Sequence, residues 1–126
     1  MPAPHLLVAV VEDDEPSRTA IGRVLRASGF EAALFESAEA FLGAAPDCAP
    51  LCLVADVHLS GISGIDLLTQ LREAGRDVPT IMTTGDRETG IRTRAERRGC
   101  AAFLQKPFDS ATLLAVIASI AERSRP

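Results

Sequence analysis

Short apolar runs alternate with helix-length stretches five times along this chain, and few folds accept that order. The continuous apolar runs at residues 6–11 and 51–55 are typical of strands buried on both faces. Weaker strands are expected at residues 30–35, 79–84 and 101–104. Strict alternation of strand and helix predicts an α/β fold, with a parallel sheet, helices on both of its faces and right-handed crossovers.

Each expected helix has a recognisable start or stop. The five helices are expected at residues 16–28, 37–42, 65–74, 87–98 and 109–120. Asp14 or Glu15 can cap the first helix, with Pro16 in its first turn. Ser37 and Asp109 are the expected caps of the second and the last helix.

Length and composition favour one domain with an aliphatic core. The 126 residues are read as a single domain, with residues 122–126 as a tail or the start of a linker. Apolar residues make up 47%, but only five are Phe and there is no Trp or Tyr, so Leu, Val, Ile and Ala must fill the core. A net charge of −4 argues against direct nucleic-acid binding by this domain.

No targeting segment or membrane-spanning run is present in the sequence, so a cytoplasmic protein without membrane contact is expected. Cys48, Cys52 and Cys100 lack the spacing of a zinc or redox motif. They are expected to be small buried thiols in a reducing compartment.

The residues that carry chemistry follow the expected strands. Asp56 ends its apolar run, and a lone Asp at such a place would most often cap a turn. Glu12 and Asp13, Thr84, and Lys106 follow or end three other strands, at the same edge of a parallel sheet. Converging carboxylates need a counter-charge, and oxygen ligands alone suit Mg²⁺ or Mn²⁺. A hydroxyl, an ammonium and a metal around one carboxylate indicate a site for a transferred phosphoryl group.

These segments resemble the receiver domain of two-component response regulators. The resemblance rests on residues 11–16, the strand and turn around Asp56, Thr84-Gly85, and residues 103–108, and it covers essentially the whole chain. Residues 35–42 are similar to the subset attached to helix-turn-helix transcription factors of the nitrogen-fixation regulator type. The resemblance implies a flavodoxin-like, doubly wound (βα)5 sandwich with strand order 2-1-3-4-5.

The resemblance also implies roles for the site residues. Asp56 accepts a phosphoryl group from a phosphohistidine of a sensor histidine kinase or histidine phosphotransfer protein. Glu12, Asp13, Asp56 and the backbone carbonyl of His58 hold Mg²⁺ or Mn²⁺. Lys106 contacts the phosphoryl oxygens. Slow self-dephosphorylation would be the only catalysis, so the protein is not expected to be an enzyme.

A switch is implied as well. Thr84 moves to hydrogen-bond the phosphoryl group, and Phe103 turns into the space that this movement vacates. The altered surface would comprise the helix at 87–98, the strand at 101–104 and the last helix. That surface would regulate a partner, an attached DNA-binding domain, or a second copy in a homodimer.

Several of these residues have simpler interpretations. Glu12 can be an acid favoured by the nearby helix dipole, and Phe103 can be plain core. Thr83 is the alternative to Thr84, although Gly85 favours Thr84. The side chain of His58 is expected to face solvent.

Two surface features also stay open. The resemblance also implies that the side chains of His58 and Asp86 lie at positions that set how fast water removes the phosphoryl group in this family. Four arginines, at positions 92, 94, 97 and 98, form either a solvated helix face or a docking surface for an acidic partner or another copy.

The chain departs from the family pattern at three places, one of which is the strand at 79–84, where Thr80 and Thr83 put hydroxyls into a strand usually richer in Val and Ile. Glu12 stands where Asp is common, although its longer side chain still reaches a metal. The turn after Asp56 reads Leu59-Ser60-Gly61 where many relatives have Pro-Gly, which predicts a loop that is mobile without metal.

Other functions are left as alternatives. The main one is a receiver-like protein-interaction module that works without phosphorylation. A phospho-aspartyl phosphatase or mutase usually has a second Asp two residues after the nucleophile, where this chain has His58. A flavin-binding protein would need an aromatic residue to stack on the ring, and there is no Trp or Tyr.

Overall fold

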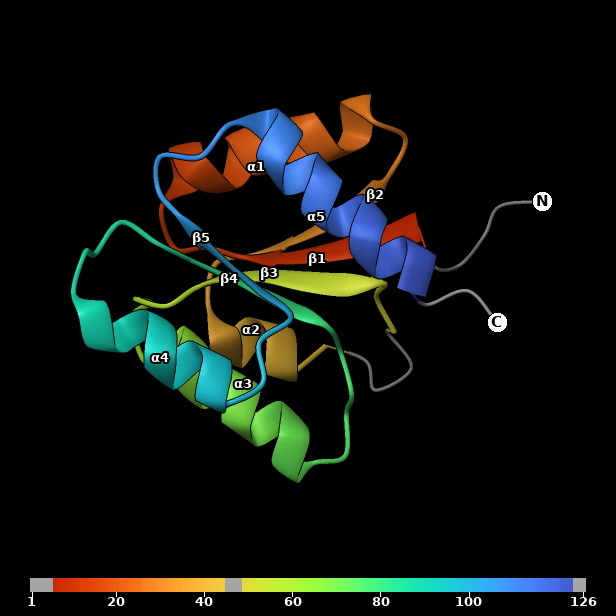
Figure 1. Ribbon diagram of the computed structural model, residues 1–126. Coiled ribbons are helices and arrows are strands. Elements are labelled where there is room, and N and C mark those ends of the chain that lie inside the picture. The colour runs from red at the N-terminus through yellow and green to blue at the C-terminus, as the bar shows by residue number, and fades with distance from the viewer. Residues whose placement is uncertain (1–5, 45–48, 124–126) are drawn as a thin grey trace.

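The computed structural model describes residues 6–44 and 49–123. Its centre is a five-stranded parallel sheet in the order β2-β1-β3-β4-β5, which confirms the predicted flavodoxin-like topology (Figure 1). The strands are β1 (Leu7–Val11), β2 (Glu31–Phe35), β3 (Cys52–Asp56), β4 (Thr80–Thr84) and β5 (Ala102–Gln105).

Helices cover both faces of the sheet. They are α1 (Glu15–Ala27), α2 (Ala38–Leu42), α3 (Gly64–Glu73), α4 (Thr89–Arg97) and α5 (Ser110–Arg123). Figure 1 shows α1 and α5 on one face and α2, α3 and α4 on the other. One core cluster lies beneath each layer, and alternate residues of the same strands point into the two clusters. The buried core of the described residues is mainly aliphatic, as expected, and it includes the ring of Phe41.

The caps predicted from the sequence hold the helix starts. Asp14 caps α1 and accepts a hydrogen bond from the Ser17 N–H, and Ser37 caps α2. Asp109 accepts hydrogen bonds from both the backbone N–H and the hydroxyl of Thr112 in the first turn of α5. These side chains satisfy backbone N–H groups that a helix leaves without partners.

Several boundaries differ from the expected ones by one or two residues. Strand β3 includes Asp56, which pairs with Thr83 of β4. Helix α4 begins at Thr89 rather than at residue 87, because a carboxylate oxygen of Asp86 accepts the Glu88 N–H and holds the preceding chain in a turn. No side chain caps this helix, so no cap residue in the sequence could have marked its start.

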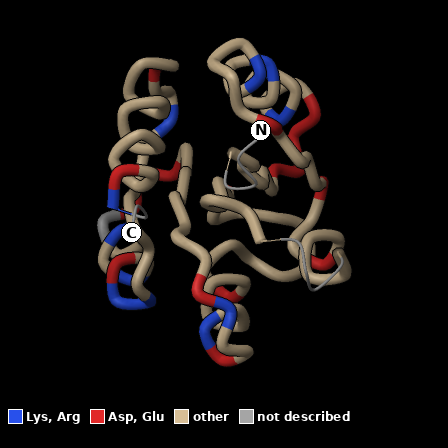
Figure 2. Tube along the Cα trace, turned by 90° about the vertical axis from the view of Figure 1, so that its right-hand side faces the viewer, with Lys and Arg blue, Asp and Glu red and all other residues tan. Residues whose placement is uncertain are grey.

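The charged residues lie mainly on the helices and at the strand ends, and the middle of the sheet is uncharged (Figure 2). Cys52 is buried, as expected, and burial raises the pKa of its thiol to about 12. Cys100 is only half-buried, and Cys48 lies outside the described residues. The end of the expected tail, residues 124–126, also lies outside them. Within the described ranges, no helix is long and apolar enough to cross a membrane.

Candidate functional site

The carboxyl ends of the strands bring the predicted site residues to one edge of the sheet. Asp56 is the last residue of β3, and Thr84 is the last residue of β4. Glu12 directly follows β1, and Lys106 directly follows β5. Strands β1, β3, β4 and β5 are consecutive neighbours in the sheet, so their ends form one continuous edge. In open α/β sheets, ligands bind in the crevice at this edge.

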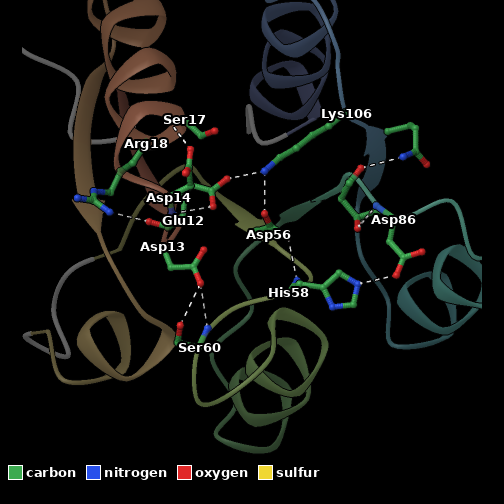
Figure 3. A network of polar contacts seen from close by, with 12 residues as sticks. Glu12, Asp13, Asp14, Ser17, Arg18, Asp56, His58, Ser60, Asp86 and Lys106 are labelled. Atoms are coloured by element: carbon green, nitrogen blue, oxygen red, sulfur yellow. Dashed lines mark hydrogen bonds and ion pairs between the residues drawn. The ribbon is translucent and has the colours of Figure 1, made fainter.

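Lys106 joins two of the carboxylates directly (Figure 3). Its Nζ donates to Glu12 Oε1 at 2.6 Å and to Asp56 Oδ2 at 2.7 Å. Glu12 is 2% exposed and Asp56 is 8% exposed, so both acids are withdrawn from water. Paired, hydrogen-bonded charges are the form in which buried carboxylates are tolerated.

The pKa values of Glu12 and Lys106 are both raised, for different reasons. Burial raises the pKa of Glu12, and the nearby Asp56 charge adds to the rise, although the Lys106 hydrogen bond opposes it. Burial alone would lower the pKa of Lys106, but the hydrogen bonds to Asp56 and Glu12 outweigh it and raise the pKa. The ammonium is therefore held in its charged form between two acids.

The other oxygen of Asp56 is fixed by the loop that follows it. Asp56 Oδ1 accepts the backbone N–H of His58 at 2.9 Å. The loop closes where the Gly64 N–H donates to the Val57 carbonyl at 2.9 Å. A Cβ on Gly64 would overlap the Asp56 carbonyl oxygen and would lie 3.0 Å from Met82 Cε. Glycine at this position therefore lets α3 start directly against the end of β3.

Asp13 is not part of the Lys106 group. It is exposed, and its Oδ2 accepts both the backbone N–H of Ser60, at 3.1 Å, and the Ser60 hydroxyl, at 3.2 Å (Figure 3). Across the described ranges, no set of three or more His, Cys, Asp and Glu side chains is arranged as a ready metal site. The predicted ligands therefore lie at one edge of the sheet without forming a closed coordination shell.

Thr84 and Asp86 form a second connection at this edge. Thr84 is fully buried, and its hydroxyl accepts the backbone N–H of Asp86 at 3.0 Å. The ring of His58 is exposed to solvent, as expected. Its Nε2 lies 3.1 Å from a carboxylate oxygen of Asp86, which connects the loop after β3 to the loop after β4 (Figure 3). The structure thus places Thr84 beside the site with its hydroxyl bonded to Asp86.

Phe103 lies on β5, opposite Met82 of β4. It is half-buried and packs against the core cluster beneath α2, α3 and α4. The guanidinium carbon of Arg92 lies 5.7 Å from the centre of its ring, a distance typical of a cation–π contact. Phe103 is therefore partly core and partly covered by a side chain of α4.

Some functional neighbours had no signal in the sequence. Ser60 binds Asp13, Gly64 contacts the Asp56 backbone, and Arg18 donates to the Glu12 carbonyl at 2.9 Å. Each contact joins residues from different elements or across a loop, and its formation depends on the exact backbone path. Ser60 is the exception, because its turn departs from the family pattern described in the sequence analysis.

The fold and this edge define an α/β protein with a buried, lysine-paired aspartate at the carboxyl end of its central strand. Comparison with known families assigns that class: the response regulator receiver domain matches residues 8–118. The chain therefore belongs to the receiver domain family of two-component response regulators. Receiver domains are signalling proteins rather than classical enzymes, and in general histidine kinases phosphorylate them.

Individual relatives agree with this assignment. Transcriptional regulatory protein FixJ of Azorhizobium caulinodans is 36% identical over 119 residues, covering 94% of this chain and 56% of that protein. FixJ of Bradyrhizobium diazoefficiens is 33% identical over 119 residues, covering 94% and 58%. The crystal structure of FixJ-N superposes with a TM-score of 0.87 at 31% identity, covering 95% and 96%. The chain thus spans just over half the length of these curated relatives.

Receiver domains generally use Mg²⁺ at the phosphorylation site. The residues present here fit that ion, because the donors at this edge are carboxylate and backbone oxygens, which Mg²⁺ prefers. Glu12 and Asp56 already share one cation, the Lys106 ammonium, so this edge selects positive charge. Among the described residues, no hydrogen-bond donor contacts the second oxygen of Asp13.

Proposed function

We propose that the chain is a phosphorylation-dependent switch and that Asp56 is its phosphoacceptor. The observation that carries this proposal is the environment of the Asp56 carboxylate. One oxygen lies 2.7 Å from the Lys106 ammonium and the other accepts the His58 N–H at 2.9 Å, at the carboxyl end of the central strand. This arrangement orients a nucleophile and sets positive charge beside it, which is most of what phosphoryl transfer requires of a protein.

The proposed reaction moves one phosphoryl group from a phosphohistidine to Asp56. A carboxylate oxygen of Asp56 attacks phosphorus and forms the new O–P bond. The P–N bond of the phosphohistidine breaks, and its electron pair stays on the imidazole nitrogen. Lys106, the chain's one lysine, then neutralises negative charge on the phosphoryl oxygens as a compact point charge.

Glu12, Asp13, Asp56 and the His58 carbonyl are the proposed holders of Mg²⁺ or Mn²⁺. The metal, when bound, would neutralise charge on the transferring phosphoryl group. Glu12 supports this role because it is buried next to Asp56 and is hydrogen-bonded to Lys106. Slow loss of the phosphoryl group to water would be the only reaction that the protein itself catalyses.

Thr84 and Phe103 are the proposed moving parts. A phosphoryl group on Asp56 offers oxygens that attract the Thr84 hydroxyl away from the Asp86 N–H, and Phe103 then fills the vacated space. The surface formed by α4, β5 and α5 would change as a result. Such a switch needs two conformations that differ in packing. A change of charge at the site then shifts the equilibrium between them.

The partners follow from this role. A sensor histidine kinase or histidine phosphotransfer protein would supply the phosphoryl group in the cytoplasm. The α4-β5-α5 surface would contact a second copy, a partner or an attached DNA-binding domain. The length of the FixJ relatives favours an attached output domain, with the chain as one receiver domain over residues 1–126.

Incubation with acetyl phosphate and Mg²⁺ tests the proposal. We expect one acid-labile phosphoryl group per chain in the wild type and none in Asp56→Asn, measured by intact-protein mass spectrometry. Asp66→Asn is the matched control, because Asp66 is exposed in the first turn of α3 and should leave labelling unchanged. Full labelling of Asp56→Asn would refute the assignment.

A further inference from the structure

We propose that Ser60 is a positioning residue for metal binding. It holds the Asp13 carboxylate by one oxygen, so that the other oxygen is presented to the ion. This inference rests on the proposed function, in which Asp13 is one of the Mg²⁺ ligands. It assigns to Ser60 a task that the loop after Asp56 could not perform with proline at this position.

The geometry supplies two donors from one residue to one atom. The Ser60 N–H lies 3.1 Å from Asp13 Oδ2, and the Ser60 hydroxyl lies 3.2 Å from the same oxygen. Figure 3 shows these two contacts on the side of Asp13 that faces the loop after Asp56. Among residues 6–44 and 49–123, the second oxygen of Asp13 receives no hydrogen bond. The contacts therefore fix the carboxylate but leave one of its two oxygens available.

Asp13 depends on Ser60 because, within residues 6–44 and 49–123, no other group donates a hydrogen bond to its side chain. Lys106 contacts Glu12 and Asp56, and its hydrogen bonds fix those two carboxylates. Asp13 is exposed, so without Ser60 its side chain would be free to rotate in solvent. Outer partners that orient a ligating carboxylate typically contribute 10- to 100-fold to metal affinity.

The loop that carries Ser60 is itself anchored. The Ile62 N–H donates to Glu39 Oε2 at 3.1 Å, which ties the loop to α2. The Gly64 N–H donates to the Val57 carbonyl at 2.9 Å, which ties it to the end of β3. With these two bonds, Ser60 is held at a fixed position relative to Asp56. These hydrogen bonds connect the second half of the loop to α2 and to the residue after β3.

Proline could not replace Ser60 in this role, because it has neither a backbone N–H nor a hydroxyl. In this chain the serine donates two hydrogen bonds to Asp13, a proposed metal ligand. We therefore expect the Mg²⁺ affinity of this chain to depend on the side chain at position 60.

The test is calorimetric titration of the unphosphorylated protein with MgCl₂, without phosphodonor. Ser60→Ala removes the hydroxyl contact and keeps the N–H contact, so we expect the Kd for Mg²⁺ to rise about 10-fold, the lower end of the outer-partner range. Ser60→Thr keeps both donors and should restore wild-type affinity. Ser63→Ala is the matched control, because its hydroxyl caps α3 through the Asp66 N–H and does not contact Asp13.

A second measurement distinguishes a Ser60 that positions Asp13 for Mg²⁺ from a Ser60 that competes with Mg²⁺ for the Asp13 carboxylate. If Ser60 positions Asp13, the Ser60 amide stays protected from hydrogen exchange when Mg²⁺ is added. Faster exchange on addition of Mg²⁺, or a Ser60→Ala variant that binds as tightly as the wild type or more tightly, would overturn the inference and leave the proposed function intact. A wild type that does not bind Mg²⁺ would overturn both.

Discussion

At the scale of single residues, one aspartate is fixed by neighbours that come from three directions. The Asp56 carboxylate accepts hydrogen bonds from Lys106, which follows β5, and from the His58 N–H in the loop after β3. Lys106 also donates to Glu12, which follows β1. Gly64 also contacts this residue, because it lets the start of α3 lie directly against the Asp56 carbonyl. A change at Gly64 therefore acts on Asp56 without touching its carboxylate.

We expect Gly64→Ala to lower the free energy of unfolding by about 1–3 kcal/mol, the usual cost of adding a group to a filled space. The new Cβ would overlap the Asp56 carbonyl oxygen and would lie 2.9 Å from the carbonyl carbon. Urea denaturation followed by circular dichroism measures the effect. Gly90→Ala in α4 is the control, because its Cβ would meet nothing nearer than 3.8 Å. Equal stability of Gly64→Ala and wild type would contradict the close approach.

The sequence alone could predict which residues meet at this edge, because parallel strands end on the same side. Asp56, Glu12 and Lys106 are placed correctly by that rule. The sequence could not predict that the Asp13 carboxylate accepts a hydrogen bond from Ser60, or that the Thr84 hydroxyl accepts one from the Asp86 N–H. Those contacts depend on loop backbone angles, which neither apolar periodicity nor residue type encodes.

At the scale of elements, helices with polar caps were located well and the uncapped helix was not. Ser37 and Asp109 mark the starts of α2 and α5 because their side chains bond the first turn. Helix α4 has no such residue, and its expected start was two residues too early. A cap that carries charge also makes its helix sensitive to pH.

Asp109 should make the stability of the protein depend on pH. Its hydrogen bonds with Thr112 lower the pKa of the Asp109 carboxyl, so the folded state favours the ionised form. That contribution is present at pH values above the unfolded-state pKa of about 4 and is lost as pH falls through the lower folded-state pKa. Asn still caps a helix but carries no charge.

The expected outcome is a melting temperature for Asp109→Asn that lies below wild type at pH 7 and meets it near pH 2. Thermal melts of both proteins across this pH range, followed by circular dichroism, give the difference directly. General acid effects act on both proteins and cancel in that difference. A gap of constant size at every pH would show that the Asp109 charge does not stabilise α5.

At the scale of the whole molecule, one sheet separates two cores and presents the site at its edge. Ile91 of α4 is buried in one core, and Ile117 of α5 is buried in the other. Both cores pack against the same five strands, so neither layer retains its support when the sheet unfolds. Strand β4 ends beside Asp56, and β5 pairs with β4 at the edge of the sheet.

Ile91→Val and Ile117→Val test that the two layers form one cooperative unit. Each removes one buried methylene group and should lower the free energy of unfolding by about 0.5–1.5 kcal/mol. The two effects should add in the double variant to within about 0.5 kcal/mol, because the side chains lie on opposite faces of the sheet. Urea denaturation followed by circular dichroism is the measurement, since the chain has no Trp or Tyr. Two separate transitions, or an unchanged midpoint for either single variant, would show that one layer unfolds independently of the sheet.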